Sequence, residues 1–114
     1  MKSKIKISTY TQYWDFHREH HYMFYLKNKL VGSYYISDDG DDFTVCALYI
    51  QEDFRGKGYS KILIKHAIDN YKELYLQVHV DNKIAINLYK KYGFEFTENN
   101  KNPRYHWMRN FNND

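Results

Sequence analysis

Cysteine, proline and glycine are scarce in this chain. Its 114 residues contain one cysteine, one proline and five glycines. A single cysteine, Cys46, cannot form an intramolecular disulfide, and no paired Cys/His spacing indicates a zinc site. So little proline and glycine excludes collagen-like and low-complexity chains. We therefore expect a domain stabilised by apolar packing, with no metal ligands.

Long hydrophobic runs and a strong charge of one sign are also missing. The longest apolar run, at 45–50, has six residues and is too short to cross a membrane. The basic start MKSKIKIST has no apolar stretch behind it, which excludes a secretory signal. The net charge of +3 is spread along the chain, whereas nucleic-acid binders concentrate their basic residues. These absences predict one cytoplasmic domain over residues 1–114, with no membrane or nucleic-acid partner.

Aromatic residues are abundant instead. The chain has thirteen Tyr and seven Phe, so much of its core must be aromatic, and its length leaves room for one core only. A basic chain rich in aromatic rings also fits a β-sheet platform for nucleic acid. We keep that as the weakest alternative, which absent or salt-insensitive oligonucleotide binding would dispose of.

The first half of the chain reads as an antiparallel meander. Asp-Gly within 38–42 and Lys27–Lys29 are typical hairpin turns. The polar and aromatic segment 12–21 has room for one short helix. The apolar segment 43–50 predicts a strand buried on both faces. The expected strands are 4–10, 22–26, 30–37 and 43–50.

The second half changes period. Residues 59–71 place Ile62, Leu63, His66, Ala67, Asn70 and Tyr71 on one side of a helix. Residues 83–92 form a second helix with the stripe Ala85, Leu88, Tyr89 and Tyr92, an N-cap at Asp81 or Asn82, and Gly93 at C′. The remaining strands are 74–80, 94–97 and 105–111. A right-handed crossover makes strands 43–50 and 74–80 parallel neighbours. The pattern predicts an α/β (α+β) fold with a mixed, mostly antiparallel sheet of six to seven strands and helices on its faces.

The segment 51–60, QEDFRGKGYS, carries the first chemical signal. Gly56 and Gly58 let the backbone approach a ligand, and they precede a helix N-terminus, which favours an anion. Arg55 and Lys57 add positive charge. These features predict a phosphate or pyrophosphate cradle, although a plain solvated turn also explains them. Neither the nucleoside-triphosphate loop nor the dinucleotide fingerprint is present.

The second signal lies downstream, at 76–94. Asn82 is an N-cap by nature, and Tyr89 alone fits a core aromatic. Their order and separation from the first segment change that interpretation. Arg55 to Ser60 matches Arg/Gln-x-x-Gly-x-Gly/Ala except for the final Ser, and residues 82–94 match Asn-x-x-Ala-x-x-Leu-Tyr-x-x-x-Gly-Phe throughout. Together the two segments resemble the GNAT superfamily of N-acetyltransferases over residues 43–97.

The resemblance implies transfer of an acetyl group from acetyl-CoA to a primary amine by direct attack in a ternary complex. The Ile50 N–H would face the thioester oxygen, and Tyr89 would protonate the departing thiolate. The strand edge ending at Ile50 would pair with pantetheine, and 56–61 would hold the pyrophosphate. The implied cofactor contacts are Leu48, Tyr49, Ile50, Arg55, Gly56, Lys57, Gly58, Tyr59, Ser60, Lys61, Asn82 and Tyr89.

The general base is the weak point of this mechanism. Freeing a lysine amine at pH 7 costs about 4 kcal/mol, whereas an α-amine costs only about 1. The two positions where relatives commonly carry glutamate are Thr44 and Gln77 here, and neither accepts a proton. His79, on the same strand face as Gln77 by alternation, is the candidate base. Ordered water and the remoter Glu52 and Glu19 are alternatives.

The acceptor site has little chain to build it. Only about fifty residues precede the phosphate motif, and any helical roof is confined to 11–21. An open groove suits a protein or peptide chain, or completion by a second subunit in a homodimer, while the resemblance leaves a small-molecule amine open as the acceptor. Loss of the usual glutamates also fits a catalytically silent acyl-CoA-binding or protein-interaction module. The side chains expected to line the groove, or merely to seal the sheet end, are Trp14, Phe16, His17, His20, His21 and Tyr22.

Overall fold

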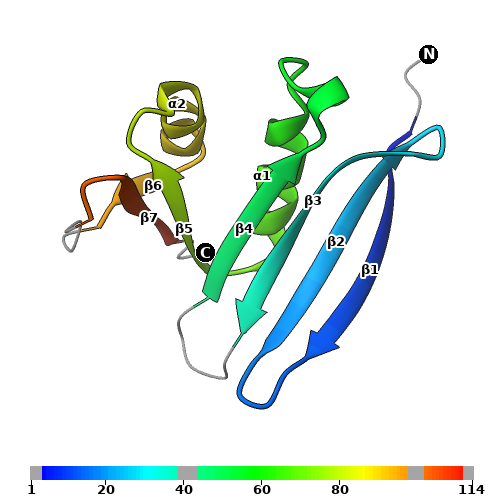
Figure 1. The fold of residues 1–114 in the computed structure, drawn as a ribbon, viewed down its shortest axis with the longest axis horizontal. Helices are drawn as coiled ribbons and strands as arrows, with labels where there is room; N and C mark the ends of the chain where they lie inside the picture. The colour runs from blue at the N-terminus through cyan, green and yellow to red at the C-terminus, as the bar shows by residue number, and fades with distance from the viewer. Residues whose placement is uncertain (1–3, 39–43, 98–101, 112–114) are drawn as a thin grey trace.

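The computed structural model describes residues 4–38, 44–97 and 102–111. Its strands form one seven-stranded sheet in the order β1-β2-β3-β4-β5-β7-β6, and Figure 1 shows how they follow one another along the chain. The elements are β1 (Lys6–Tyr13), β2 (Arg18–Leu26), β3 (Lys29–Asp38), β4 (Thr44–Ile50), η1 (Glu52–Phe54), α1 (Tyr59–Asn70), β5 (Glu73–His79), α2 (Lys83–Lys91), β6 (Phe94–Phe96) and β7 (Tyr105–Phe111).

This architecture confirms the predicted fold class. β1 to β4 are an antiparallel meander, β4 and β5 are parallel, and β7 is antiparallel to both β5 and β6. Asn82 is the N-cap of α2, and Gly93 follows the helix with a φ of 92°. Lys27 and Asn28 both have positive φ, as a tight hairpin turn requires. Of the turn expected at 38–42, residues 39–42 lie outside the described part of the chain.

The helix expected within 12–21 is wrong. β1 continues to Tyr13 and β2 begins at Arg18, so a tight turn closed by the Trp14 N–H donating to the His17 carbonyl (2.9 Å) joins two strands. Aromatic and β-branched side chains pair well across strands, and the Tyr10 and His21 rings stack with centroids 4.4 Å apart. A β-hairpin therefore stands where a helical roof was expected.

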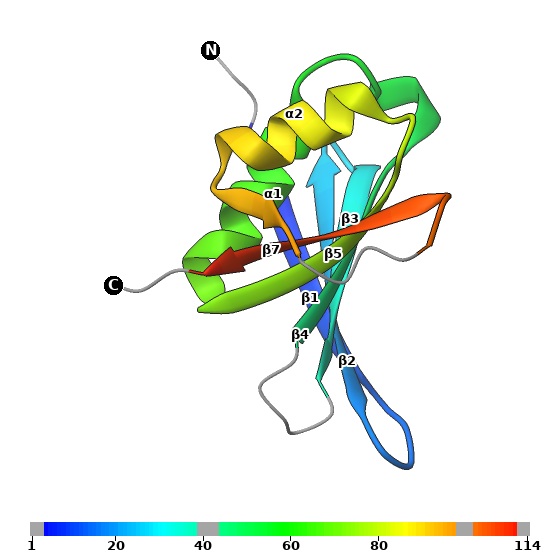
Figure 2. The same ribbon diagram turned by 90° about the vertical axis from the view of Figure 1, so that its left-hand side faces the viewer.

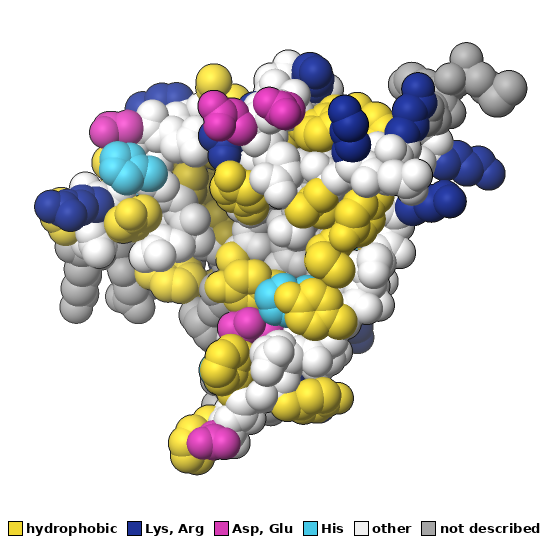
Figure 3. All heavy atoms as spheres, turned by 45° about the vertical axis from the view of Figure 1, so that its right-hand side comes forward, with side chains coloured by type: hydrophobic (Ala, Val, Ile, Leu, Met, Phe, Trp, Pro, Cys, Tyr) yellow, Lys and Arg dark blue, Asp and Glu magenta, His cyan; other side chains and the backbone are white. Residues whose placement is uncertain are grey.

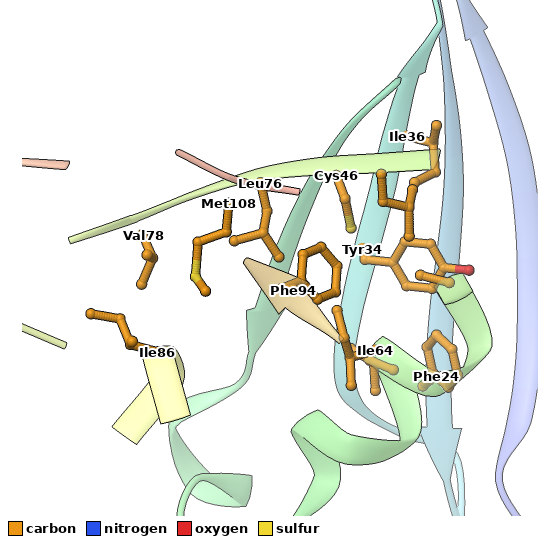
Figure 4. Close-up of a cluster of buried hydrophobic side chains, with 13 residues drawn as sticks. Phe24, Tyr34, Ile36, Cys46, Ile64, Leu76, Val78, Ile86, Phe94 and Met108 are labelled. Carbon is orange, nitrogen blue, oxygen red and sulfur yellow. The ribbon is translucent and has the colours of Figure 1, made fainter. Parts of the chain in front are cut away.

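Both helices pack on the same face of the sheet. Figure 2 places α1 and α2 on one side of the strands, and Figure 4 shows the buried side chains filling the layer between. On β5 the alternate residues Leu74, Leu76 and Val78 point into this core. Ile64 of α1 and Ile86 of α2 meet them from the helical side. In the described part of the chain the opposite face carries no helix.

That one-sided arrangement corrects two expectations about burial. β4 is not buried on both faces, because Cys46 is 4% exposed while Tyr49, on the helix-free face, is 52% exposed. The buried side of α1 includes Ile64 and leaves Ile62 42% exposed, so the stripe is rotated relative to the prediction. Both differences follow from where the sheet lies, which the periodicity of one segment does not specify.

His66 of α1 makes stability depend on pH. Its Nδ1 lies 2.5 Å from the Tyr34 hydroxyl, and burial lowers the pKa of His66 against a smaller opposing effect of Asp69. A lowered pKa means that the unfolded chain binds the proton more tightly. The stabilisation is therefore complete above about pH 6.5, the ordinary histidine value, and is lost as the pH falls below it.

We expect the melting temperature of the wild type to fall more steeply between pH 7.5 and pH 5 than that of His66→Gln. Glutamine keeps an acceptor for Tyr34 but does not titrate. Thermal denaturation across this pH range measures the difference. Parallel profiles for the two proteins would contradict the assignment to His66.

Asn110 of β7 anchors the end of α2. Its side chain is 6% exposed, and its Nδ2 donates to the carbonyl oxygen of Tyr92 at 2.8 Å. Asn110→Leu should lower the free energy of unfolding by about 1–3 kcal/mol, because that carbonyl then loses its donor. Urea denaturation measures the change. The exposed Asn87 supplies the control, since Asn87→Ala should cost less than about 0.5 kcal/mol.

Candidate active site

The parallel strands β4 and β5 diverge. They share a single ladder pair, Val45 with Tyr75, although each strand is seven residues long. Both strands run away from this pair toward their C-terminal ends, and Figure 1 shows the ribbons separating there between α1 and α2. The edge of β4 beyond the pair therefore lacks a ladder partner on β5.

The backbone of Ile50 faces this open edge. The N–H of the next residue, Gln51, donates to the Val31 carbonyl of β3 at 2.8 Å. Because successive residues of an antiparallel strand point their backbone groups to opposite sides, Ile50 and Leu48 turn theirs away from β3. The divergence thus leaves two N–H groups on the side where a further extended chain would pair.

The segment after β4 leads to an open helix N-terminus. Gly56 and Gly58 have φ of 75° and 85°, a conformation that side chains rarely adopt. Gly58 is the N-cap of α1 and gives the helix no side-chain cap. The first amides of α1, from Tyr59 to Lys61, are therefore donors at the positive end of the helix dipole.

Arg55 braces this segment. Its Nε donates to the Ile50 carbonyl at 3.0 Å, and its guanidinium lies 5.2 Å from the centre of the Tyr49 ring. Lys57 lies 5.8 Å from the Phe54 ring centre. Both cations are exposed, so the segment is held by its own side chains while its positive charge stays accessible to an anion.

Asn82 and Tyr89 lie on α2. The Asn82 Oδ1 accepts the Ala85 N–H at 3.2 Å, which is the capping role that sequence alone predicts. The Tyr89 ring packs against Phe94 with centroids 5.8 Å apart. Burial, with a smaller effect of Cys46, raises the pKa of Tyr89 to about 12. Tyr89 is therefore a protonated hydrogen-bond donor throughout the physiological pH range.

The candidate bases lie away from Tyr89. His79 points to the helix-free face together with Gln77, as predicted, whereas Tyr89 packs on the core side. The His79 Nδ1 accepts the Asp81 N–H at 3.1 Å, and its ring lies edge-on to Tyr105. Glu19 contacts His21 at 3.1 Å, which occupies one of its oxygens, and Glu52 is exposed in η1.

The expected groove-lining cluster does not form one surface. Tyr22 and His20 are on the core face, where the Tyr22 hydroxyl lies 2.5 Å from that of Tyr71. His21 is on the opposite face, and Phe16 is 89% exposed at the hairpin tip. The described residues contain no group of three or more His, Cys, Asp or Glu that could hold a metal ion.

Sequence reasoning missed a row of rings on the helix-free face. Tyr10, His21 and Tyr35 stack across β1, β2 and β3, with successive centroids 4.4 and 5.0 Å apart. Their alternation within each strand was readable, but the register that aligns them was not.

Among the described helices, none is long and apolar enough to span a membrane.

Several known acetyltransferases are similar to this chain in sequence or in structure. A peptidyl-lysine N-acetyltransferase of Escherichia coli, YjaB, is 41% identical over 51 residues, which are 45% of this chain and 35% of the relative. The spermidine N-acetyltransferase of Vibrio cholerae, solved with CoA and spermine, aligns with a TM-score of 0.69 at 22% identity, over 82% of this chain and 65% of that chain. A GNAT-family acetyltransferase of Streptococcus pneumoniae aligns with a TM-score of 0.70 at 20% identity, over 82% of this chain and 66% of that chain.

The chain spans about a third of the length of the curated relatives it matches and about two thirds of the length of the similar structures. The alignment to the solved structures supports the fold that the strand order describes. A model of the acetyltransferase (GNAT) family matches residues 3–94, which is most of the chain. This chain therefore belongs to the acetyltransferase (GNAT) family.

Proposed function

We propose that this chain transfers an acetyl group from acetyl-CoA to a primary amine. The observation that carries the proposal is the divergence of β4 from β5 next to an uncapped helix N-terminus. An extended pantetheine arm needs a free strand edge, and a diphosphate needs clustered N–H donors. Both lie in one continuous segment of this chain. The relatives named above are acetyltransferases, which supports the same reaction.

The cofactor contacts follow from this arrangement. The β4 edge at Leu48 and Ile50 would pair with the pantetheine amides, with Tyr49 beside them. The amides of 56–61 would hold the pyrophosphate, and Arg55 and Lys57 would add charge. Asn82 would hydrogen-bond the pantetheine region with the part of its amide that the helix cap leaves free. The Ile50 N–H would stabilise the negative charge that grows on the carbonyl oxygen as the amine attacks.

Tyr89 would act on the departing sulfur. Its pKa of about 12 lies well above the ~8.5 of an ordinary thiol, so complete proton transfer from the phenol to a thiolate is unfavourable. A hydrogen bond from the phenol to the sulfur is favourable, because the donor stays protonated in a low-dielectric site. We therefore assign Tyr89 the stabilisation of the leaving thiolate.

The amine proton needs another route. His79 is half exposed on the helix-free face, where water reaches its ring. From there it would receive the proton through ordered water. The acceptor class, an amine of a protein, a peptide or a small molecule, is supported by relatives named for peptidyl-lysine and spermidine. A cytoplasmic location remains a prediction of the sequence.

Thermal stabilisation tests the cofactor. Acetyl-CoA at about a hundred times its dissociation constant should add ~2.7 kcal/mol to the free energy of unfolding, CoA should act similarly, and ATP should not. Equal stabilisation by ATP would indicate a general phosphate site and contradict the assignment.

Amine-dependent release of CoA separates an enzyme from a catalytically silent acyl-CoA-binding or interaction module. Gln77 in place of a carboxylate favours that second candidate. The enzyme predicts CoA release with at least one class of amine: peptide α-amine, peptidyl-lysine or polyamine. Stabilisation by acetyl-CoA without release by any of these amines would favour the module.

A further inference from the structure

Among the described residues, β1 is an outer strand of the sheet. It pairs with β2 on one side only, and Figure 1 shows it at the edge of the molecule. Seven of its eight residues are exposed, and they include apolar ones: Ile7 is 43%, Tyr10 48% and Tyr13 69% exposed. A long exposed edge strand with apolar side chains is a template for pairing with another strand.

The exposed side chains of β1 are arranged symmetrically about Tyr10. Ile7 and Tyr13 lie three residues to either side and share the core-side face of the strand. If two copies of β1 pair antiparallel with Tyr10 opposite Tyr10, Ile7 of each copy lies opposite Tyr13 of the other. Residues opposite one another in such a pair share a face, so this register brings the exposed apolar side chains of the two copies into contact.

The same register continues the ring row on the other face. Tyr10, His21 and Tyr35 already stack in one line across three strands, and Figure 3 shows hydrophobic side chains gathered on this side of the molecule. Tyr10 is the exposed end of that line. Placing a second Tyr10 beside it extends the stack across both copies, where aromatic pairs stabilise a sheet.

The charges at the ends of β1 are complementary. Lys4 and Lys6 lie at its beginning, and Asp15 lies in the turn just after its end. Antiparallel alignment brings the basic end of one copy beside the acidic turn of the other. It also places Lys6, the edge lysine that would otherwise discourage pairing, opposite the exposed Trp14 ring, a favourable cation–π partner.

We propose that two copies of this chain associate through β1, with Tyr10 on the two-fold axis and the two sheets joined into one. The axis is perpendicular to the sheet, so the core-side and helix-free faces of both copies coincide. The interface is separate from the β4–β5 divergence. Its existence does not depend on the proposed acetyl transfer.

Oxidative cross-linking tests the register. In this register residue 10 of one copy lies opposite residue 10 of the other. The Cα atoms of such an antiparallel pair are close enough for a disulfide to bridge them. Tyr10→Cys should therefore form a disulfide-linked dimer with a mild oxidant. Tyr13→Cys is the matched control, because its two copies would lie about 20 Å apart. The native Cys46 is buried and should leave the wild type uncross-linked.

Sedimentation of the untreated proteins tests the association itself. The wild type should sediment at twice its 14.0 kDa mass at concentrations of about 100 µM. Ile7→Lys with Tyr13→Lys puts like charges opposite one another and should give monomers. Ile7→Glu with Tyr13→Lys pairs opposite charges at the same positions and should restore the dimer.

A monomeric wild type overturns the proposal. So does equal cross-linking at positions 10 and 13, or a dimer that ignores the charge pattern, since each places the contact elsewhere. Stabilisation by acetyl-CoA, measured on the same samples, reports the proposed function separately. A failure of one result therefore does not obscure the other.

Discussion

Tyr89→Phe should lower kcat by about 10²-fold or more while leaving acetyl-CoA binding within about twofold of the wild type. The phenol lies on α2 against Phe94, so removing one oxygen keeps the packing of the ring. What is lost is the hydrogen bond to the departing sulfur, which strengthens only as the thioester breaks. An interaction made only in the transition state affects kcat rather than binding.

Steady-state release of CoA and a thermal shift with acetyl-CoA measure the two quantities separately. Tyr92→Phe is the matched control, because it removes a hydroxyl group from the C-cap residue of the same helix, whose ring also packs against the core. It should retain nearly full turnover. A Tyr89→Phe enzyme with unchanged turnover would remove Tyr89 from the mechanism, and equal losses in both variants would point to the helix rather than the hydroxyl.

Gly56→Asp should weaken acetyl-CoA binding by about 30-fold relative to Gly56→Asn. Gly56 has a φ of 75°, and no heavy atom beyond its two chain neighbours lies within 4 Å of the Cβ that a substitution would add. Asp and Asn are the side chains that tolerate this conformation best, and they are nearly equal in size. The comparison therefore isolates one negative charge. Against two phosphate charges about 4 Å away in water, that charge costs about 2 kcal/mol.

Titration with acetyl-CoA measures the affinities of the two variants. Their melting temperatures without ligand should be similar, because both carry the same backbone strain. S-acetylpantetheine lacks the diphosphate, and turnover with it should not distinguish Asp from Asn. If the two variants bind acetyl-CoA equally, the diphosphate lies elsewhere than 56–61. If Gly56→Asp is worse than Gly56→Asn with S-acetylpantetheine by the same factor as with acetyl-CoA, the cause is a distorted β4 edge and not the added charge.

Local patterns predicted most of the fold correctly. The alternation in β5, the 3.6-residue period of α2 and its cap at Asn82 each depend on neighbours within a few residues. The prediction of a helix within 12–21 was wrong because this segment has no strong hydrophobic period of its own. Its strands are stabilised by partners such as His21 on Tyr10, and cross-strand partners are not visible in one segment.

Some features of the candidate site could likewise be predicted from the sequence, and others could not. The glycines before α1 and the Asn82–Tyr89 spacing were readable as motifs. The direction of the Ile50 N–H was not, because it depends on the hydrogen bond of Gln51 to Val31 in another strand. The raised pKa of Tyr89 results from burial by residues distant in sequence. The roles of Ile50, His79 and Tyr89 remain predictions, and Tyr89→Phe tests the last of them.

The two sequence motifs carried the family resemblance, and the amino-acid order by itself determined both helices, the cap at Asn82 and which turns need positive φ. Those features arise from short-range sterics, capping and side-chain period. Only the tertiary structure decided that both helices cover one face, that β4 parts from β5 after a single pair, and that Tyr10 ends an exposed row of rings. These depend on strand register and sheet order, which are set by burial summed over the whole chain.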